Sequence, residues 1–431
     1  MRLADEAIGS TYTEAVSWGL LNTLVDCAPR MAGHEGERAA IDAMAEQFRD
    51  LGLDDVTVEE FEVPTWYRGR SELRVPSTDR TYTGSHELIG LPLTPPGTVS
   101  GPIVDVGYGT PEEYDEVDVE GALVLASGGT PESYDRWLHR REKYEMAADR
   151  GAVGFLFRSR MDGCLPPTGG IGGDSPPGDI PGVGISRELA DKLTRGAIDD
   201  AELTVECELE HQPSANVSAR LGPDTDEEIL LTAHHDAHDI AEGANDNGCG
   251  CALVAEVARL LKTVEDDLDT AVRATTFGAE EIGLRGSTYA VDQLDHDDIT
   301  AVFNLDGIGT TRDLAVDTHG FSEIARAAEV VDERGSTPIE VNEKVNTHSD
   351  HWPFAREGVP AAMAYSVGGD DRRGWGHTHA DTLDKLDPRD LQSIAVPLAE
   401  IVIELADDGC SPEHVSAETV RERAREEGYD V

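Results

Sequence analysis

The sequence predicts an α/β fold, with a mixed, mostly parallel sheet flanked by helices and a small β-rich domain inserted ahead of the main part. Three observations predict it. From residue 206 onward, short apolar strands alternate with amphipathic helices. Between residues 83 and 205, short β-type segments predominate. At 431 residues, the chain is also longer than a domain with a single hydrophobic core usually is. We therefore expect residues 1–82 and 206–431 to form the main domain and residues 83–205 the insert.

The N-terminal part contains one clear helix and one clear strand. Apolar residues recur at helical spacing between residues 36 and 51, and Gly52 supplies a stop. The apolar positions are Ile41, Met44, Phe48 and Leu51. Residues 56–63 alternate in part between apolar and polar side chains, which predicts a strand with one irregularity.

The insert reads as short strands with little helix. Three apolar segments follow glycines, at residues 101–106, 121–126 and 151–157, and a helical stretch ends at Arg150. A loop rich in Pro and Gly covers residues 165–182, and a further strand follows it. No residue of the insert has the spacing of a catalytic motif.

The last part of the chain alternates strands and helices. The predicted strands are 229–233, 274–277, 300–305 and 361–367, and the predicted helices are centred on 253–261 and 391–405. In sheets of this kind, ligands bind outside the carboxyl ends of the strands. We therefore expect functional residues directly after these strands.

The composition excludes some classes of partner. Acidic residues number 86 against 35 basic ones, only five of them lysines, for a net charge of −51. Such a chain lacks the basic surface that nucleic acids or anionic membranes require. The acids are spread along the whole length, which favours a folded protein adapted to high salt, where the screening length falls to about 3 Å at 1 M.

Neither a membrane nor an oxidising compartment is indicated. No segment approaches the roughly 20 apolar residues of a spanning helix. The first 17 residues lack the pattern of a secretory signal. Six cysteines are too few for a disulfide scaffold at this length, and Cys249 and Cys251 have no second pair with which to form a zinc knuckle. A cytoplasmic location is the expectation.

Five segments rich in His, Asp and Glu lie at strand ends or in the loops beyond them. They are Thr232–Asp239, Gly243–Gly248, Ala279–Gly283, Asn304–Gly307 and Gly376–Thr382. All five can therefore meet at one rim of the sheet. Imidazole and carboxylate ligands together suit zinc, although other divalent metals are possible. Two ions about 3.5–4 Å apart are well served by a bridging carboxylate. In an extended backbone the neighbours Glu280 and Glu281 point opposite ways, so one can bind metal while the other reaches a water molecule.

These motifs resemble, in order, those of the M28 family of co-catalytic zinc exopeptidases, and the insert resembles a protease-associated (PA) domain. The resemblance implies two zinc ions: His234, Asp246 and Asp306 would hold one, and Asp246, Glu281 and His377 the other. Glu280 would be the general base, and Asp236 would orient His234. The insert would shape substrate access or serve as structure only.

Several nearby residues are set aside. His235 is expected to be packed or exposed. His238 and Asp239 lie in a loop that could line the site, although an ordinary polar loop is the expectation. His379 ranks below His377 as a ligand, and Asp350 is a possible supporting residue. The glycine clusters at 169–173 and 307–309 are not phosphate loops, because neither has the required sequence context.

The resemblance implies an enzyme that removes single residues from peptide ends, with peptides as substrates and possible homo-oligomers. An aminopeptidase is the first reading. A carboxypeptidase remains an alternative, because the terminal carboxylate of a substrate could bind to Arg285, Arg356, Arg372 or Arg373. A single-zinc cyclotransferase is disfavoured by Asp246 together with Glu281. A non-catalytic binding protein is disfavoured because every ligand and the base are present.

Overall fold

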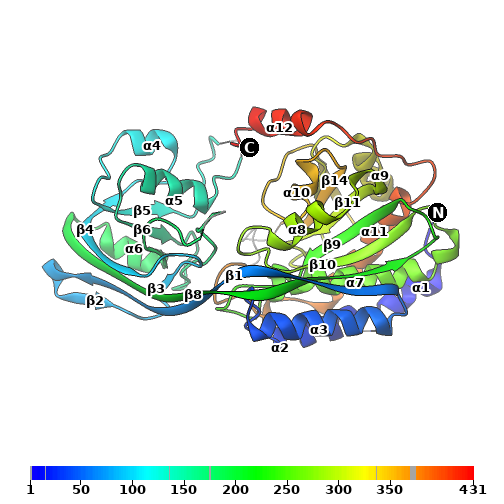
Figure 1. The fold of residues 1–431 in the computed structure, drawn as a ribbon, viewed down its shortest axis with the longest axis horizontal. Helices are drawn as coiled ribbons and strands as arrows, with labels where there is room; N and C mark the ends of the chain where they lie inside the picture. Colours follow the sequence, from blue (N-terminus) through cyan, green and yellow to red (C-terminus); the bar gives the residue numbers. More distant parts are fainter. Residues whose placement is uncertain (1, 15, 135, 174–175, 336, 369–374) are drawn as a thin grey trace.

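A computed structural model describes residues 2–14, 16–134, 136–173, 176–335, 337–368 and 375–431. Two lobes lie side by side along the longest axis, joined by two very long strands (Figure 1). The helices are α1 (Asp5–Thr11), α2 (Val16–Asp26), α3 (Glu35–Asp50), α4 (Pro111–Asp115), α5 (Arg140–Asp149), α6 (Arg187–Leu193), α7 (Cys249–Lys262), α8 (Arg285–Gln293), α9 (Ser322–Glu333), α10 (Trp352–Ala355), α11 (Pro388–Leu405) and α12 (Ala417–Glu426).

The strands belong to one continuous sheet that runs through both lobes. They are β1 (Asp54–Val75), β2 (Arg80–Tyr82), β3 (Leu88–Gly90), β4 (Gly97–Asp105), β5 (Leu123–Ser127), β6 (Gly154–Arg158), β7 (Gly182–Ile185), β8 (Ile198–Leu221), β9 (Glu228–His234), β10 (Ala271–Phe277), β11 (Ile299–Leu305), β12 (Leu314–Asp317), β13 (Ile339–Asn342) and β14 (Ala361–Ser366).

The main lobe has the predicted mixed, mostly parallel sheet flanked by helices. Its strand order is β13-β12-β14-β11-β9-β10-β8, and β9, β10, β11 and β14 are parallel to one another. Strand β8 runs antiparallel to β10, and β12 runs antiparallel to β14. Because the four central strands share one direction, their carboxyl ends open onto the same rim.

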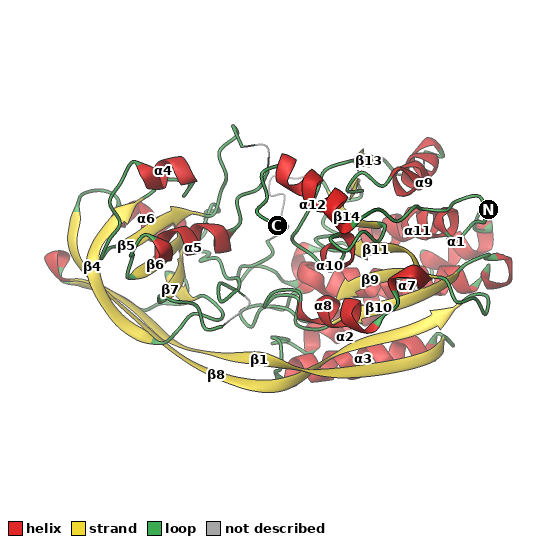
Figure 2. Cartoon of the chain, turned by 45° about the horizontal axis from the view of Figure 1, so that its top comes forward, coloured by secondary structure: helices red, strands yellow, loops and turns green. Residues whose placement is uncertain are grey.

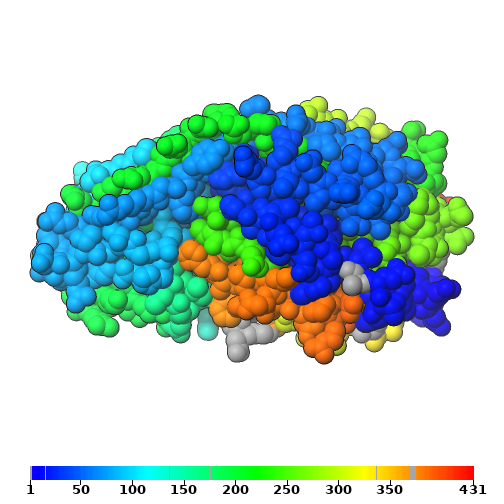
Figure 3. Space-filling model, turned by 90° about the horizontal axis from the view of Figure 1, so that it is seen from below, coloured from blue at the N-terminus to red at the C-terminus, as the bar shows by residue number. Residues whose placement is uncertain are grey.

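Apolar faces of the helices cover this sheet. Helix α7 is buried along nearly its whole length between β9, α2 and α11. Helix α3 lies along the β1–β8 ribbon, and its Ile41, Met44 and Phe48 are buried as their spacing predicts (Figure 2). Seen from below, the N-terminal helices (blue) lie beside a C-terminal segment (orange), so the two ends of the sequence build one body (Figure 3). In the described parts of the chain, no helix combines the length and hydropathy of a membrane span.

The second lobe is the insert, with parallel strands β4 to β7 and β3 antiparallel at the edge. Two apolar clusters form its core. The strand predicted at residues 56–63 is far longer than expected: β1 pairs with β8 over almost its full length, with irregularities between Asp54 and Thr57 and between Arg68 and Ser71. Past this point β1 contributes Leu73 and Val75 to the core of the insert. Strands β1 and β8 therefore each pass from the main lobe into the insert without a break. The domain boundaries at residues 83 and 205 stay a prediction from the sequence.

Candidate active site

The five predicted segments gather at one rim of the main sheet. His234 is the last residue of β9, Glu280 and Glu281 follow β10, and Asp306 follows β11. His377 arrives from the loop beyond β14, and Asp246 lies in a tight turn just before α7. The parallel strand directions explain this convergence, because each chain segment leaves the sheet on the same side.

Asp246 lies between the two predicted histidine ligands. Its Oδ1 is 3.4 Å from Nε2 of His234, and its Oδ2 is 3.3 Å from Nε2 of His377. On the first side, Asp306 Oδ1 is 3.6 Å from His234 Nε2. On the second side, Glu281 Oε2 is 3.6 Å from His377 Nε2. One carboxylate thus offers one oxygen to each of two neighbouring sites, which is the arrangement a bridging ligand needs.

The donor set fits two divalent cations. Two groups of three ligand atoms lie within 4.8 Å of one another: His234, Glu280 and Asp306, and His238, Glu281 and His377. Nε2 of His234 and Oε1 of Glu281 are buried and have no hydrogen-bond partner. Buried imidazole nitrogens and carboxylate oxygens left open in this way are the groups that a metal ion satisfies.

The electrostatics of the rim point the same way. Burial raises the pKa of Glu281 to about 7, and burial together with the neighbouring carboxylates raises the pKa of Glu280 well above its usual range. Burial alone would lower the pKa of His234, but the surrounding carboxylates, Glu280 first, raise it well above its usual range. The carboxylates of the site therefore carry more negative charge than its histidines can balance. Bound divalent cations would neutralise this excess.

Asp236 links the first histidine to the Glu280–Glu281 pair. Its Oδ1 is 3.3 Å from Nδ1 of His234, so it can hold that ring with Nε2 facing Asp246 and Asp306. The same carboxylate accepts the backbone N–H groups of Glu280, at 3.0 Å, and Glu281, at 3.2 Å. One buried side chain therefore orients the last residue of β9 and the two glutamates that follow β10.

Further residues support the site, and their roles were not predicted from the sequence. Asp381 accepts the backbone N–H of Asp246 at 3.1 Å, and Ser349 donates to Asp306 at 2.6 Å. Glu37 of α3 accepts the N–H of Ala279 at 3.2 Å, next to Glu280. Arg30 is fully buried and donates to backbone carbonyls of the loops that carry His234 and Asp246. Asp381 belongs to the segment of His377, and Ser349 begins the segment Ser349–Phe354, which also resembles the family, but neither role was predicted.

The expectation that His238 belongs to an ordinary polar loop is wrong. Its side chain is buried, with Nε2 2.8 Å from Glu281 Oε2 and 3.1 Å from His377 Nδ1. Burial lowers its pKa to about 3, so the ring is neutral, and its Nε2–H can donate to the Glu281 carboxylate. Periodicity could not reveal this, because the contact depends on how the loop folds back over β10.

The other residues that were set aside lie outside the metal cluster. His235 is buried and contacts Thr276, as a packed residue would. Asp239 forms an ion pair with Arg68, and His379 contacts the carbonyls of Ile240 and Ser85. Arg285 and Arg356 line the cleft described next, and Asp350 is buried. Arg372 and Arg373 fall outside the described residues.

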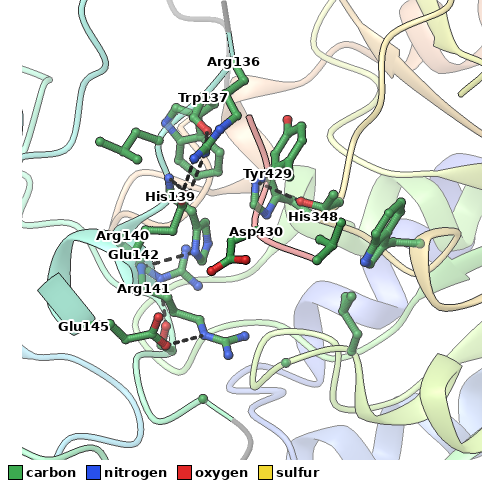
Figure 4. Close-up of a pocket in the computed structure, with 18 of the residues that line it drawn as sticks. Arg136, Trp137, His139, Arg140, Arg141, Glu142, Glu145, His348, Tyr429 and Asp430 are labelled. Carbon is green, nitrogen blue, oxygen red and sulfur yellow. Dashed lines mark hydrogen bonds and ion pairs between the residues drawn. The ribbon is translucent and has the colours of Figure 1, made fainter. Parts of the chain in front are cut away.

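A cleft of about 1170 Å³ separates the two lobes and reaches the candidate metal site. Glu280, Glu281 and His377 lie on its wall. The insert contributes lining residues between Arg136 and Glu145, and it contacts the main lobe there: the ring of His139 stacks on that of His348 with centroids 4.7 Å apart, and Arg136 lies over the ring of Tyr429 (Figure 4). A peptide could therefore enter between the lobes and meet the cluster at the strand ends.

Comparisons with known proteins agree with this geometry. The model of peptidase family M28 matches residues 216–402, and the PA domain model matches residues 99–193. Aminopeptidase YwaD of Bacillus subtilis (strain 168) is 28% identical over 380 residues, covering 84% of this chain and 78% of that protein. Carboxypeptidase Q of Bos taurus is 26% identical over 416 residues, covering 91% and 85%.

Among solved structures, BSAP, a zinc aminopeptidase from Bacillus subtilis, superposes with a TM-score of 0.71 and 25% identity over 91% of this chain and 95% of that one. The predicted fold and the resemblance of the motifs are confirmed. The matched motifs, the shared fold and the paired carboxylate–imidazole clusters together lead to one conclusion: the chain carries a metallopeptidase domain of family M28, over residues 216–402, and a PA domain, over residues 99–193.

Proposed function

We propose that this protein is an aminopeptidase with two metal ions, zinc first, that hydrolyses the N-terminal bond of peptides. The observation that carries the proposal is Asp246, whose two oxygens face His234 on one side and His377 on the other. The proposal also draws support from two similar proteins, one named an aminopeptidase and the other a zinc aminopeptidase. Peptides are the substrates expected of this family.

We assign His234, Asp246 and Asp306 to the first ion, and Asp246, Glu281 and His377 to the second. When bound, the ions would polarise the scissile carbonyl and the attacking water. Glu280 lines the cleft, so its carboxylate can accept the proton of that water and pass it to the leaving amine. Asp236 serves as a positioning residue, because it holds both His234 and the backbone of Glu280.

The role of Glu280 is tested by Glu280→Gln, which keeps the shape but removes the basic oxygen. We expect the variant to bind two ions per chain, measured by elemental analysis, while turnover falls by about 10²–10⁴-fold. Glu329→Gln, an exposed change on α9, is the matched control and should behave as wild type. Near wild-type turnover by a fully loaded Glu280→Gln protein would remove Glu280 from this role.

The direction of cleavage needs its own experiment, since Arg285 and Arg356 line the cleft and one similar protein is named a carboxypeptidase. Peptides with a free amine, and the same peptides with a blocked amine, are compared with and without a chelator. Hydrolysis of the free-amine set alone, abolished by chelation, is expected. Equal hydrolysis of blocked peptides with a free carboxylate would favour the carboxypeptidase.

The acidic composition adds a condition to these assays. With a net charge of −51, self-repulsion between surface carboxylates weakens as salt screens them. We therefore propose that activity and stability increase toward molar salt, and the peptide panel is run over that range. The cytoplasmic location remains a prediction from the sequence.

A further inference from the structure

A loop of the insert reaches the second of the two proposed metal positions. This insert loop, residues 168–173, belongs to the Pro- and Gly-rich stretch that follows β6. The backbone N–H of Thr168 donates to the carbonyl of His377 at 2.9 Å. In return, Nδ1 of His377 lies 3.2 Å from the carbonyl of Thr168. Two residues that are 209 positions apart are thus paired in both directions.

The second contact determines which nitrogen of His377 is open. A backbone carbonyl can only accept, so Nδ1 carries the hydrogen when this bond is made. His238 Nε2 also lies 3.1 Å from this Nδ1, but its own hydrogen is donated to the nearer Glu281 Oε2, at 2.8 Å. The lone pair of the neutral ring is then on Nε2, the atom that faces Asp246 Oδ2 and Glu281 Oε2. A hydrogen bond of this kind behind a metal-binding histidine sets its tautomer and its orientation.

The insert loop also touches the other residue that is specific to the second ion. Gly170 packs on the backbone of Glu281: a Cβ built on Gly170 would lie 3.0 Å from the Glu281 carbonyl oxygen. Arg140 donates to the carbonyl of Gly170 at 3.1 Å, and Arg285 donates to that of Gly173 at 2.9 Å. The insert loop is therefore held in place from both lobes.

The residues of the first ion take their support from the main lobe instead. His234 is held by Asp236, and its carbonyl accepts from Sγ of Cys251. Asp306 accepts from Ser349. These contacts come from the loop after β9, from α7 and from the segment before α10, so the two sites differ in what supports them.

We propose that the insert is a structural component of the second metal site. It orients His377 through Thr168 and seats Glu281 through Gly170, so the affinity of the second ion, but not that of the first, depends on how the insert loop is docked. This inference rests on the proposed two-ion function. The alternative is an insert that only frames the cleft, in which case moving the loop leaves both affinities unchanged.

The test uses the full-length chain with a side chain added at the contact, Gly170→Val, and the milder Gly170→Ala in case the larger change prevents folding. Gly196→Ala is the matched control: it lies in the same insert, and its added Cβ meets no atom within 4 Å. Stepwise binding of Zn²⁺ is measured by competition with a chromophoric chelator, and folding is checked by circular dichroism.

We expect the second ion to bind about 10–100-fold more weakly in a folded Gly170 variant, with the first ion and the control unchanged. The proposal would be overturned if folded Gly170→Ala bound each ion as tightly as wild type does. It would also be overturned if the variant bound both ions more weakly by the same factor. Failure of the proposed function itself would look different, because wild-type protein would then bind fewer than two ions.

Discussion

Arg30 offers the most informative single perturbation of the fold around the site. Its guanidinium is fully buried and donates to four backbone carbonyls, at distances from 2.6 to 2.9 Å. The acceptors are Leu24, His235, Glu242 and Gly243. Arg30→Met keeps an unbranched apolar stem but removes the guanidinium and with it all four hydrogen bonds.

The magnitude follows from what each carbonyl retains. Leu24 still accepts from the N–H of Cys27, and Gly243 from that of Gly248. The carbonyls of His235 and Glu242 lose the donor that Arg30 supplies, and a buried unsatisfied group costs about 1–3 kcal/mol. Two carbonyls lose their donor and two lose one of two donors, while the variant no longer has to bury a charge. Together these effects lower the free energy of unfolding by about 3–5 kcal/mol.

The assay is chemical denaturation followed by tryptophan fluorescence, with zinc titration on the folded fraction. We expect a clearly lower midpoint and weaker binding of both ions, because the loops carrying His234 and Asp246 share this one anchor. Arg389→Met is the control, since that guanidinium is exposed and pairs only locally with Asp387. A midpoint for Arg30→Met equal to that of the control would refute the reasoning.

Two further predictions concern a buried histidine and a buried carboxyl group. His238→Leu should weaken the second ion at least tenfold in zinc titrations, whereas His238→Gln, which keeps an N–H donor for Glu281, should restore most of the loss; a Gln variant as weak as Leu would argue against a positioning role. Burial raises the pKa of Asp317 to about 6, so between about pH 4 and 6 the folded protein keeps a proton that the unfolded chain has released. Wild-type stability should therefore fall by about 2–3 kcal/mol relative to Asp317→Asn as the pH rises through that window, and parallel denaturation midpoints for the two proteins from pH 4 to 7 would contradict it.

Local patterns were enough for the elements and for the chemistry of the rim. The apolar spacing of Ile41, Met44 and Phe48 predicted α3, and short apolar runs predicted β9, β10, β11 and β14. The metal-type residues follow these strands in the sequence, so a parallel sheet brings them together whatever the details of packing. Short-range information suffices here because strand direction alone decides which edge a residue reaches.

What the tertiary structure alone decided is which other groups lie behind those residues. Arg30 contacts the carbonyl of His235 across 205 positions, and Thr168 meets His377 across 209. The burial of His238 and the uninterrupted path of β1 and β8 through both lobes are likewise features that only the tertiary structure shows. Hydrogen bonds between distant backbone carbonyls and buried side chains leave no periodic pattern in the sequence. They exist only because the fold closes those particular loops over the sheet.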